Sequence, residues 1–145
     1  MNFLYKNNKH IYTTIHILIF TLFLYSGISK LTTFEVFVNN LDKSPILANL
    51  NTKLIAVVVI ILELFIVAAL FFDKVNKVGY FLTFFILLFF TGYILIMMKL
   101  SPYLPCSCGG LLDLLSWNQH LVFNILFMAM SAILFFRRTN PQRTI

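Results

Sequence analysis

Four long apolar runs constrain this sequence more than any other feature. Each run lies between successive charged residues, and Glu63 is the single formal charge inside any of them. Each approaches the ~20 residues that an α-helix needs to cross roughly 30 Å of hydrocarbon. The strands of a membrane barrel would alternate apolar and polar residues, which these runs do not. We therefore predict an all-α membrane protein, a four-transmembrane-helix bundle forming one domain over residues 1–145, with spans at about 11–29, 54–72, 78–98 and 116–136.

The composition supports the same class. The chain is 60% hydrophobic and 11% charged, with a mean hydropathy of +0.90, which is too apolar for a soluble domain of 145 residues. The net charge of +6 comes from Lys and Arg residues that flank the apolar runs instead of forming one basic patch. This distribution is typical of membrane topology, so we expect the lipid bilayer as a partner and no nucleic acid.

The positive charges also predict an orientation. With both termini in the cytoplasm, seven Lys and Arg residues lie inside and four outside, which the positive-inside rule favours. The outer four are Lys30, Lys43, Lys53 and Lys99. The first run exceeds the ~7–15 apolar residues of a signal peptide, so we interpret it as a retained span. Segments 30–53 and 99–115 then share the outer face.

The first outer segment predicts a short amphipathic helix at the membrane surface. Thr32 and Glu35 have the spacing of a capping box, and apolar residues then recur at helical intervals. Those residues are Phe34, Phe37, Val38 and Leu41. Asn51 or Thr52 is the expected N-cap of the second span. This helix could be a packing lid over the bundle or a docking surface for a partner, and both interpretations stay open.

Both cysteines of the chain lie in the second outer segment, as Cys106 and Cys108 with Ser107 between them. On an oxidising outer surface, two such thiols are expected to pair. A disulfide between residues i and i+2 closes a small strained ring, which adds little stability and is easily reduced. Thiol–disulfide exchange is therefore favoured, while a structural disulfide and a Cu(I) or Zn site remain alternatives.

Ser116 and Gln119 have the spacing of a second capping box, at the start of the last span. A stripe of residues at spacings of three, four and seven then descends into the membrane on one helix face. It comprises Trp117, His120, Asn124, Met128 and Ser131. We expect His120 to act as acid or base for the thiol pair, and Trp117 and Asn124 to contact any bound cofactor. The structural alternatives are a headgroup anchor for Trp117 and a hydrogen-bonded polar residue for His120.

Glu63 lies at the midpoint of the second span, where an ionised carboxylate costs at least ~2.5 kcal/mol. We therefore expect it to be neutral or paired inside the bundle. Thr91 and Tyr93 of the third span are the predicted partners by depth, and His16 lies nearer the cytoplasmic half. A proton-handling role and a purely structural hydrogen bond remain equal alternatives.

With these residues identified, the chain resembles the DoxX-like superfamily of four-helix membrane proteins. It resembles more closely the MauE branch, the redox-associated proteins of methylamine utilisation. The similarity covers most of residues 11–136. The segments that carry it are 25–31 (YSGISKL), 62–64 (LEL), 106–110 (CSCGG) and 115–120 (LSWNQH), followed by Asn124.

The resemblance implies a task outside the bacterial cytoplasmic (inner) membrane, with the cysteine loop on the periplasmic side. MauE-like proteins are associated with thioredoxin-like partners and with disulfide formation or reduction. Carried over by position, Cys106 and Cys108 are the redox pair and Glu63 is the characteristic intramembrane carboxylate. Family members often have Arg before the Asn of the last helix, where this chain has Phe123 before Asn124.

We therefore predict a membrane thiol–disulfide redox protein that exchanges with a thioredoxin-like partner or a secreted client. Quinone is the candidate cofactor. Similar four-helix thiol oxidases that reduce quinone carry two cysteine pairs, and this chain has one, so a complete relay would take a second pair from a partner. The alternatives are a non-catalytic small subunit of a larger membrane complex and a metal-handling membrane protein.

Overall fold

A computed structural model of the chain describes residues 2–47, 49–100 and 116–139. These residues form five α-helices and no strand: α1 (Asn2–Thr32), α2 (Phe34–Asp42), α3 (Thr52–Phe71), α4 (Asn76–Leu100) and α5 (Trp117–Thr139). Four of them are long and apolar enough to cross a membrane, over His10–Thr32, Thr52–Phe71, Asn76–Leu100 and Asn118–Arg138. The predicted all-α class is confirmed, and each span lies within a few residues of its predicted position.

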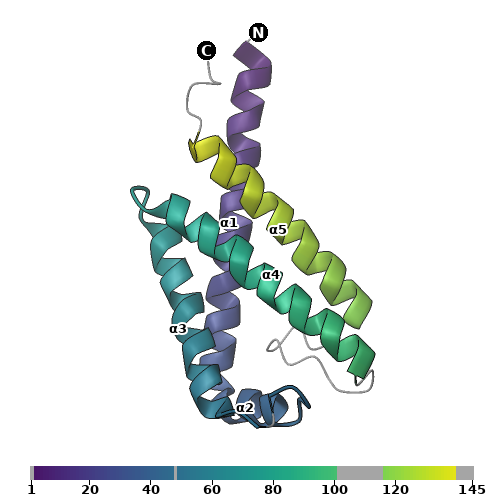
Figure 1. Cartoon of the computed structure of the whole chain (residues 1–145). Helices are drawn as coiled ribbons and strands as arrows, with labels where there is room; N and C mark the ends of the chain where they lie inside the picture. The colour runs from purple at the N-terminus through teal and green to yellow at the C-terminus, as the bar shows by residue number, and fades with distance from the viewer. Residues whose placement is uncertain (1, 48, 101–115, 140–145) are drawn as a thin grey trace.

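The long helices pack mainly as neighbouring pairs. The closest association is that of α4 with α5, and α3 packs against both α1 and α4. Figure 1 shows the start of α1 and the end of α5 at one end of the molecule, with α2 at the other. At the first end, the Arg137 guanidinium lies 3.5 Å from the centre of the Tyr12 ring. The four spans thus return the chain to the side on which it began.

The core is apolar and draws on all four long helices. Its buried members are Ile19, Phe23, Ile66, Leu70, Tyr80, Leu87, Phe127 and Leu134. Large apolar side chains also cover the outside of the bundle, where Phe89 is 82% exposed and Phe71 is 71% exposed. Such a surface suits lipid as the surrounding solvent, because lipid tails are as apolar as the side chains themselves.

Two of the three predicted helix caps form, and one prediction is wrong. The Asn51 side chain accepts a hydrogen bond from the Leu54 N–H and caps α3. Ser116 and Gln119 form the reciprocal capping box of α5. Thr32, in contrast, is still part of α1, and its hydroxyl donates to the carbonyls of Ile28 and Ser29. Because α2 follows after a single residue, Thr33 occupies its N-cap position, and no side chain caps the helix.

The short helix between the first two spans is present as α2. It buries Phe37 and Val38 against Ala56 and Ile60 in the first half of α3. The Thr52 hydroxyl, at the start of α3, donates to the carboxylate of Asp42, the last residue of α2. The predicted amphipathic helix is therefore confirmed as an element that packs on α3, and its location at the membrane surface stays a prediction.

Small residues allow the helices to approach closely at two positions. A Cβ added to Gly27 would lie 3.2 Å from Leu64 Cδ2, and one added to Gly79 would lie 2.8 Å from Leu70 Cδ2. From the sequence, the small residues Gly27, Ala68, Ala69 and Gly92 are the predicted points of close helix approach. Ala69 is buried, but Ala68 is exposed and a Cβ on Gly92 would meet nothing within 4 Å. The prediction is thus wrong for Gly92, which lies where α4 diverges from its neighbour.

Candidate functional site: a buried ion pair beside two cavities

A buried ion pair joins α1 to α3. The Lys30 ammonium lies 2.7 Å from Glu63 Oε1, and the two side chains are 3% and 1% exposed. The Ser26 hydroxyl accepts a hydrogen bond from Lys30 at 2.5 Å and donates to the same Glu63 oxygen at 3.2 Å. Three polar side chains are therefore hydrogen-bonded to one another through Glu63 Oε1, and pairing of this kind is how a membrane protein retains a charge.

The local sequence of α1 builds this arrangement. Ser26 and Lys30 are four residues apart, so they lie on the same helix face one turn apart. Gly27 lets α3 approach that face, because its missing side chain leaves room for Leu64, the residue after Glu63. The ammonium also lies 5.7 Å and 6.0 Å from the ring centres of Phe37 and Phe90, within cation–π range.

These contacts correct the predicted partners of Glu63. The carboxylate pairs with Lys30 and Ser26, not with Thr91, whose hydroxyl donates to the Leu87 carbonyl. The other expected partner, Tyr93, lines a separate apolar cavity. The error lies in the depth of α3. The middle of α3 meets the last two turns of α1, where Ser26 and Lys30 lie, while α2 packs on the first half of α3.

Lys30 is absent from the predicted partners of Glu63 because its place at the end of the first apolar run assigns it to the charges of the outer face. Two signals point to it. One is its spacing from Ser26, and the other is that a lone intramembrane carboxylate needs a cation. The expectation that Glu63 is paired inside the bundle is confirmed.

A small cavity adjoins the ion pair, and three of the predicted site residues meet there. Glu63, His120 and Asn124 all line it, together with Ser26 and Lys30. His120 and Asn124 come from the first two turns of α5, one turn apart on the same face, and are 2% and 3% exposed. Further along that face, the Ser131 hydroxyl donates to the Tyr80 carbonyl. His120, Asn124 and Ser131 therefore lie together on a buried face of α5, and their spacing predicted that they share one face.

Within the part of the chain that the structure describes, some polar atoms at this cavity have no hydrogen-bond partner. They are the second carboxylate oxygen of Glu63, Oε2, and the side-chain nitrogen of Asn124, Nδ2. Buried polar groups are nearly always satisfied, and each exception requires an explanation. Both residues line the same cavity, so a small polar molecule in it could bond to either atom.

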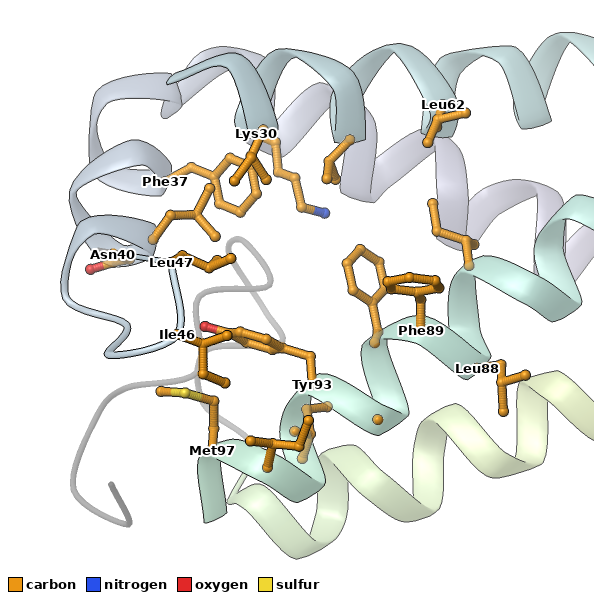
Figure 2. A pocket seen from close by; sticks show the side chains of 18 of the residues that line it. Lys30, Phe37, Asn40, Ile46, Leu47, Leu62, Leu88, Phe89, Tyr93 and Met97 are labelled. Carbon is orange, nitrogen blue, oxygen red and sulfur yellow. The ribbon is translucent and has the colours of Figure 1, made fainter. Parts of the chain in front are cut away.

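A second, larger cavity of about 920 Å³ lies between α2, α3 and α4. Its walls are almost entirely apolar, and Figure 2 shows the side chains of Lys30, Phe37, Phe89 and Tyr93 around the same space. The Lys30 ammonium points into that space in Figure 2. Lys30 and Phe90 line both cavities, so these two residues separate the apolar cavity from the polar one.

The remaining predicted site residues cannot be placed in this geometry. Cys106 and Cys108 lie outside the described residues, as does the side chain of Trp117, the first residue of α5. Among the side chains that the structure does describe, no group of three or more His, Cys, Asp or Glu could hold a metal ion.

The family model for the methylamine utilisation protein MauE matches residues 8–137, which is most of the chain. The chain belongs to the MauE family. No curated protein and no solved structure matches it. The resemblance to MauE proteins that the motifs indicated is therefore confirmed, while the wider DoxX-like relationship stays a prediction.

Membership of the MauE family and four apolar helices together make this a multi-pass membrane protein linked to methylamine utilisation. The matched region includes every residue of the buried ion pair and of the polar cavity, and it extends over the cysteine segment. The site described above therefore lies within the MauE-like part of the chain.

Proposed function

We propose that this MauE-family protein is a membrane thiol–disulfide redox protein of the bacterial inner membrane, with Cys106 and Cys108 as its redox pair on the periplasmic side. The observation that carries the proposal is the polar cavity inside the bundle. His120, in the first turn of α5, lines this cavity beside Glu63 and Lys30. The cysteines belong to the connection between α4 and α5, so their segment is attached to the helix that begins at the cavity.

The reaction is an exchange of one disulfide for another. A thiolate of the pair attacks a partner disulfide, a mixed disulfide forms, and the second thiolate of the pair then displaces the partner's sulfur. Two electrons pass to the partner, whose disulfide becomes a dithiol while Cys106 and Cys108 become a disulfide. The attacking thiol must give up a proton and the leaving thiolate must receive one. His120 is the proposed acid and base for this transfer, and Glu63 the proposed second group.

A thioredoxin-like periplasmic protein or a secreted client is the proposed partner. Little of the described chain lies outside the four spans, so a larger membrane assembly would have to be contacted through the bilayer-facing surface or α2. A soluble thioredoxin-like domain requires only an accessible cysteine segment. For this reason the exchange function is preferred over that of a non-catalytic subunit.

Lipophilic quinone is the proposed cofactor, held in the large apolar cavity between α2, α3 and α4. A volume of about 920 Å³ lies within the usual range of small-molecule sites. Phe37, Phe89 and Tyr93 supply aromatic walls, and Lys30 supplies a hydrogen-bond donor at the inner side. Because Glu63 neutralises Lys30, this donor suits an uncharged carbonyl better than a phosphate headgroup. In the reverse direction of the exchange, a partner dithiol reduces the Cys106–Cys108 disulfide and itself becomes a disulfide. The resulting thiol pair would then pass two electrons and two protons to a bound quinone and return to the disulfide.

The decisive experiment replaces the cysteines in the full-length protein within membranes. We expect Cys106→Ser and Cys108→Ser each to abolish exchange with oxidised thioredoxin as the probe. One of the two should also accumulate a mixed disulfide that the wild type resolves, and Ser107→Ala is the matched control that keeps both thiols. Gel shifts after alkylation report the redox state of each protein.

Two results would contradict the proposal. If the reduced wild-type protein left oxidised thioredoxin unchanged and kept both of its own thiols, the cysteines would have no exchange role and the protein would be a scaffold. If Cu or Zn co-purified with the wild type and was lost with the cysteines, while no disulfide formed under oxidising conditions, the pair would be a metal site.

A further inference from the structure

The polar cavity is small and is lined by side chains from four helices. Its volume is about 30 Å³, and its walls come from α1, α3, α4 and α5. One water molecule needs roughly 10–15 Å³ and two to four polar partners. The cavity therefore has room for one water molecule, and it is too small for an organic ligand.

The polar atoms at its wall match the needs of a water. Glu63 Oε2 is an acceptor, Asn124 Nδ2 is a donor, and both lack a hydrogen-bond partner within the described chain. Leaving such a buried group unsatisfied costs ~1–3 kcal/mol, and more when the group is charged. Glu63 belongs to α3 and Asn124 to α5. A water molecule between the two side chains would bond to both atoms without a direct contact between them.

We propose that this cavity binds one water molecule, which donates to Glu63 Oε2, accepts from Asn124 Nδ2 and stands between the Glu63 carboxylate and the His120 imidazole. The water completes the hydrogen bonding of the buried ion pair. It also gives the ion pair a proton path to His120 in the first turn of α5. The water passes one proton to the Glu63 carboxylate as it takes up another from the His120 imidazole, or the reverse.

The cavity wall defines which groups can share this proton. Lys30 of α1 and His120 of α5 are the titratable side chains that face Glu63 there, while α4 contributes Leu87 and Phe90. Phe37 of α2 lies against Lys30 and carries no proton to exchange. The water site stands on these contacts alone, whereas its use as a proton path in thiol–disulfide exchange rests on the proposed function.

The test is infrared difference spectroscopy of the full-length protein in lipid vesicles, with the difference produced by changing the pH. We expect an O–H stretching band of bound water that shifts when H₂¹⁶O is replaced by H₂¹⁸O. Asn124→Leu, which removes the donor and fills the cavity, should lose this band. Thr83→Val is the matched control, because Thr83 Oγ1 is equally buried and without a partner in the described chain but does not line the cavity.

A carboxyl band that changes together with the water band, and is lost in Glu63→Gln, would assign the proton path. The absence of an ¹⁸O-sensitive band in the wild type would overturn the proposal even if no variant folded. Persistence of the band in folded Asn124→Leu would overturn it too. Because the pH change requires no cysteine chemistry, these outcomes do not depend on whether Cys106 and Cys108 exchange disulfides.

Discussion

At the scale of single residues, Lys30 and Glu63 depend on each other inside the bundle. Each would be costly alone in a bilayer, and each is buried here with the other as its counter-ion. Such a pair contributes little net stability, because desolvation offsets most of the attraction. Removing one partner is a different matter, since it leaves a single charge in an apolar interior.

We expect Lys30→Met to destabilise the protein by about 3–5 kcal/mol, and Lys30→Met combined with Glu63→Leu to recover most of that loss. Reversible unfolding in mixed detergent micelles, followed by circular dichroism, measures both. Arg138→Ala is the control, because its pair with Asp73 is exposed and its removal should have no measurable effect. Glu63→Leu alone completes the set. If the losses in unfolding free energy of the two single variants added up to that of the double variant, the pairing would have no energetic role.

The residue scale also shows where sequence reasoning ends. That Glu63 must be paired follows from its position in an apolar run, because an isolated intramembrane charge is expensive. Which residue pairs with it depends on the offset between α3 and α1, which is a property of the helix packing and not of the local sequence pattern. His120 and Asn124 could be predicted from their spacing, since helical periodicity alone decides that they share a face.

At the scale of elements, some helix caps can be predicted from the sequence and others depend on tertiary packing. Ser116 and Gln119 form their capping box because α5 begins at Trp117, and the first N–H groups of a helix have no partner within it. Thr32 and Glu35 have the same spacing, but α1 continues through Thr32, so its hydroxyl bonds back to the preceding turn. The Thr32–Glu35 spacing is a local sequence pattern, whereas the residue at which α1 ends depends on tertiary packing. The spacing alone therefore does not predict the cap.

The divergence of α3 and α4 yields a prediction about the large cavity. The two helices are close at Gly79, where a Cβ would come within 3.1 Å of the Leu70 backbone nitrogen, and apart at Gly92, which lines the cavity. We expect Gly92→Phe to fold, to fill the space and to reduce the quinone that co-purifies at least tenfold. Gly92→Ala should retain quinone, because its Cβ meets nothing within 4 Å.

Chromatography of organic extracts from the purified protein measures that quinone directly. If wild-type protein yielded no quinone after purification in mild detergent and exogenous quinone did not bind, the cavity would not be a quinone site. If Gly92→Phe retained as much as Gly92→Ala, quinone would bind elsewhere. Neither result would touch the exchange function, which the cysteine variants test separately.

At the scale of the whole molecule, the structure changes the charge count that predicts topology. Sequence analysis placed Lys30 among four positive charges on the outer face, but this residue is 2% exposed and paired with Glu63. Three outer charges then remain, Lys43, Lys53 and Lys99, against the same seven on the side of the termini. The asymmetry is therefore stronger than the sequence alone indicated, and it favours cytoplasmic termini.

This orientation predicts that Cys106 and Cys108 react from the periplasm. In spheroplasts treated with a reductant, a membrane-impermeant maleimide should label both thiols before the membrane is permeabilised. Asp73→Cys in a Cys106→Ser, Cys108→Ser background is the matched control. Its side chain is 94% exposed in the turn between α3 and α4, which four-span topology places on the side of the termini. That cysteine should react only after permeabilisation. The reverse pattern would put the redox pair in a reducing cytoplasm, where a strained disulfide would not persist.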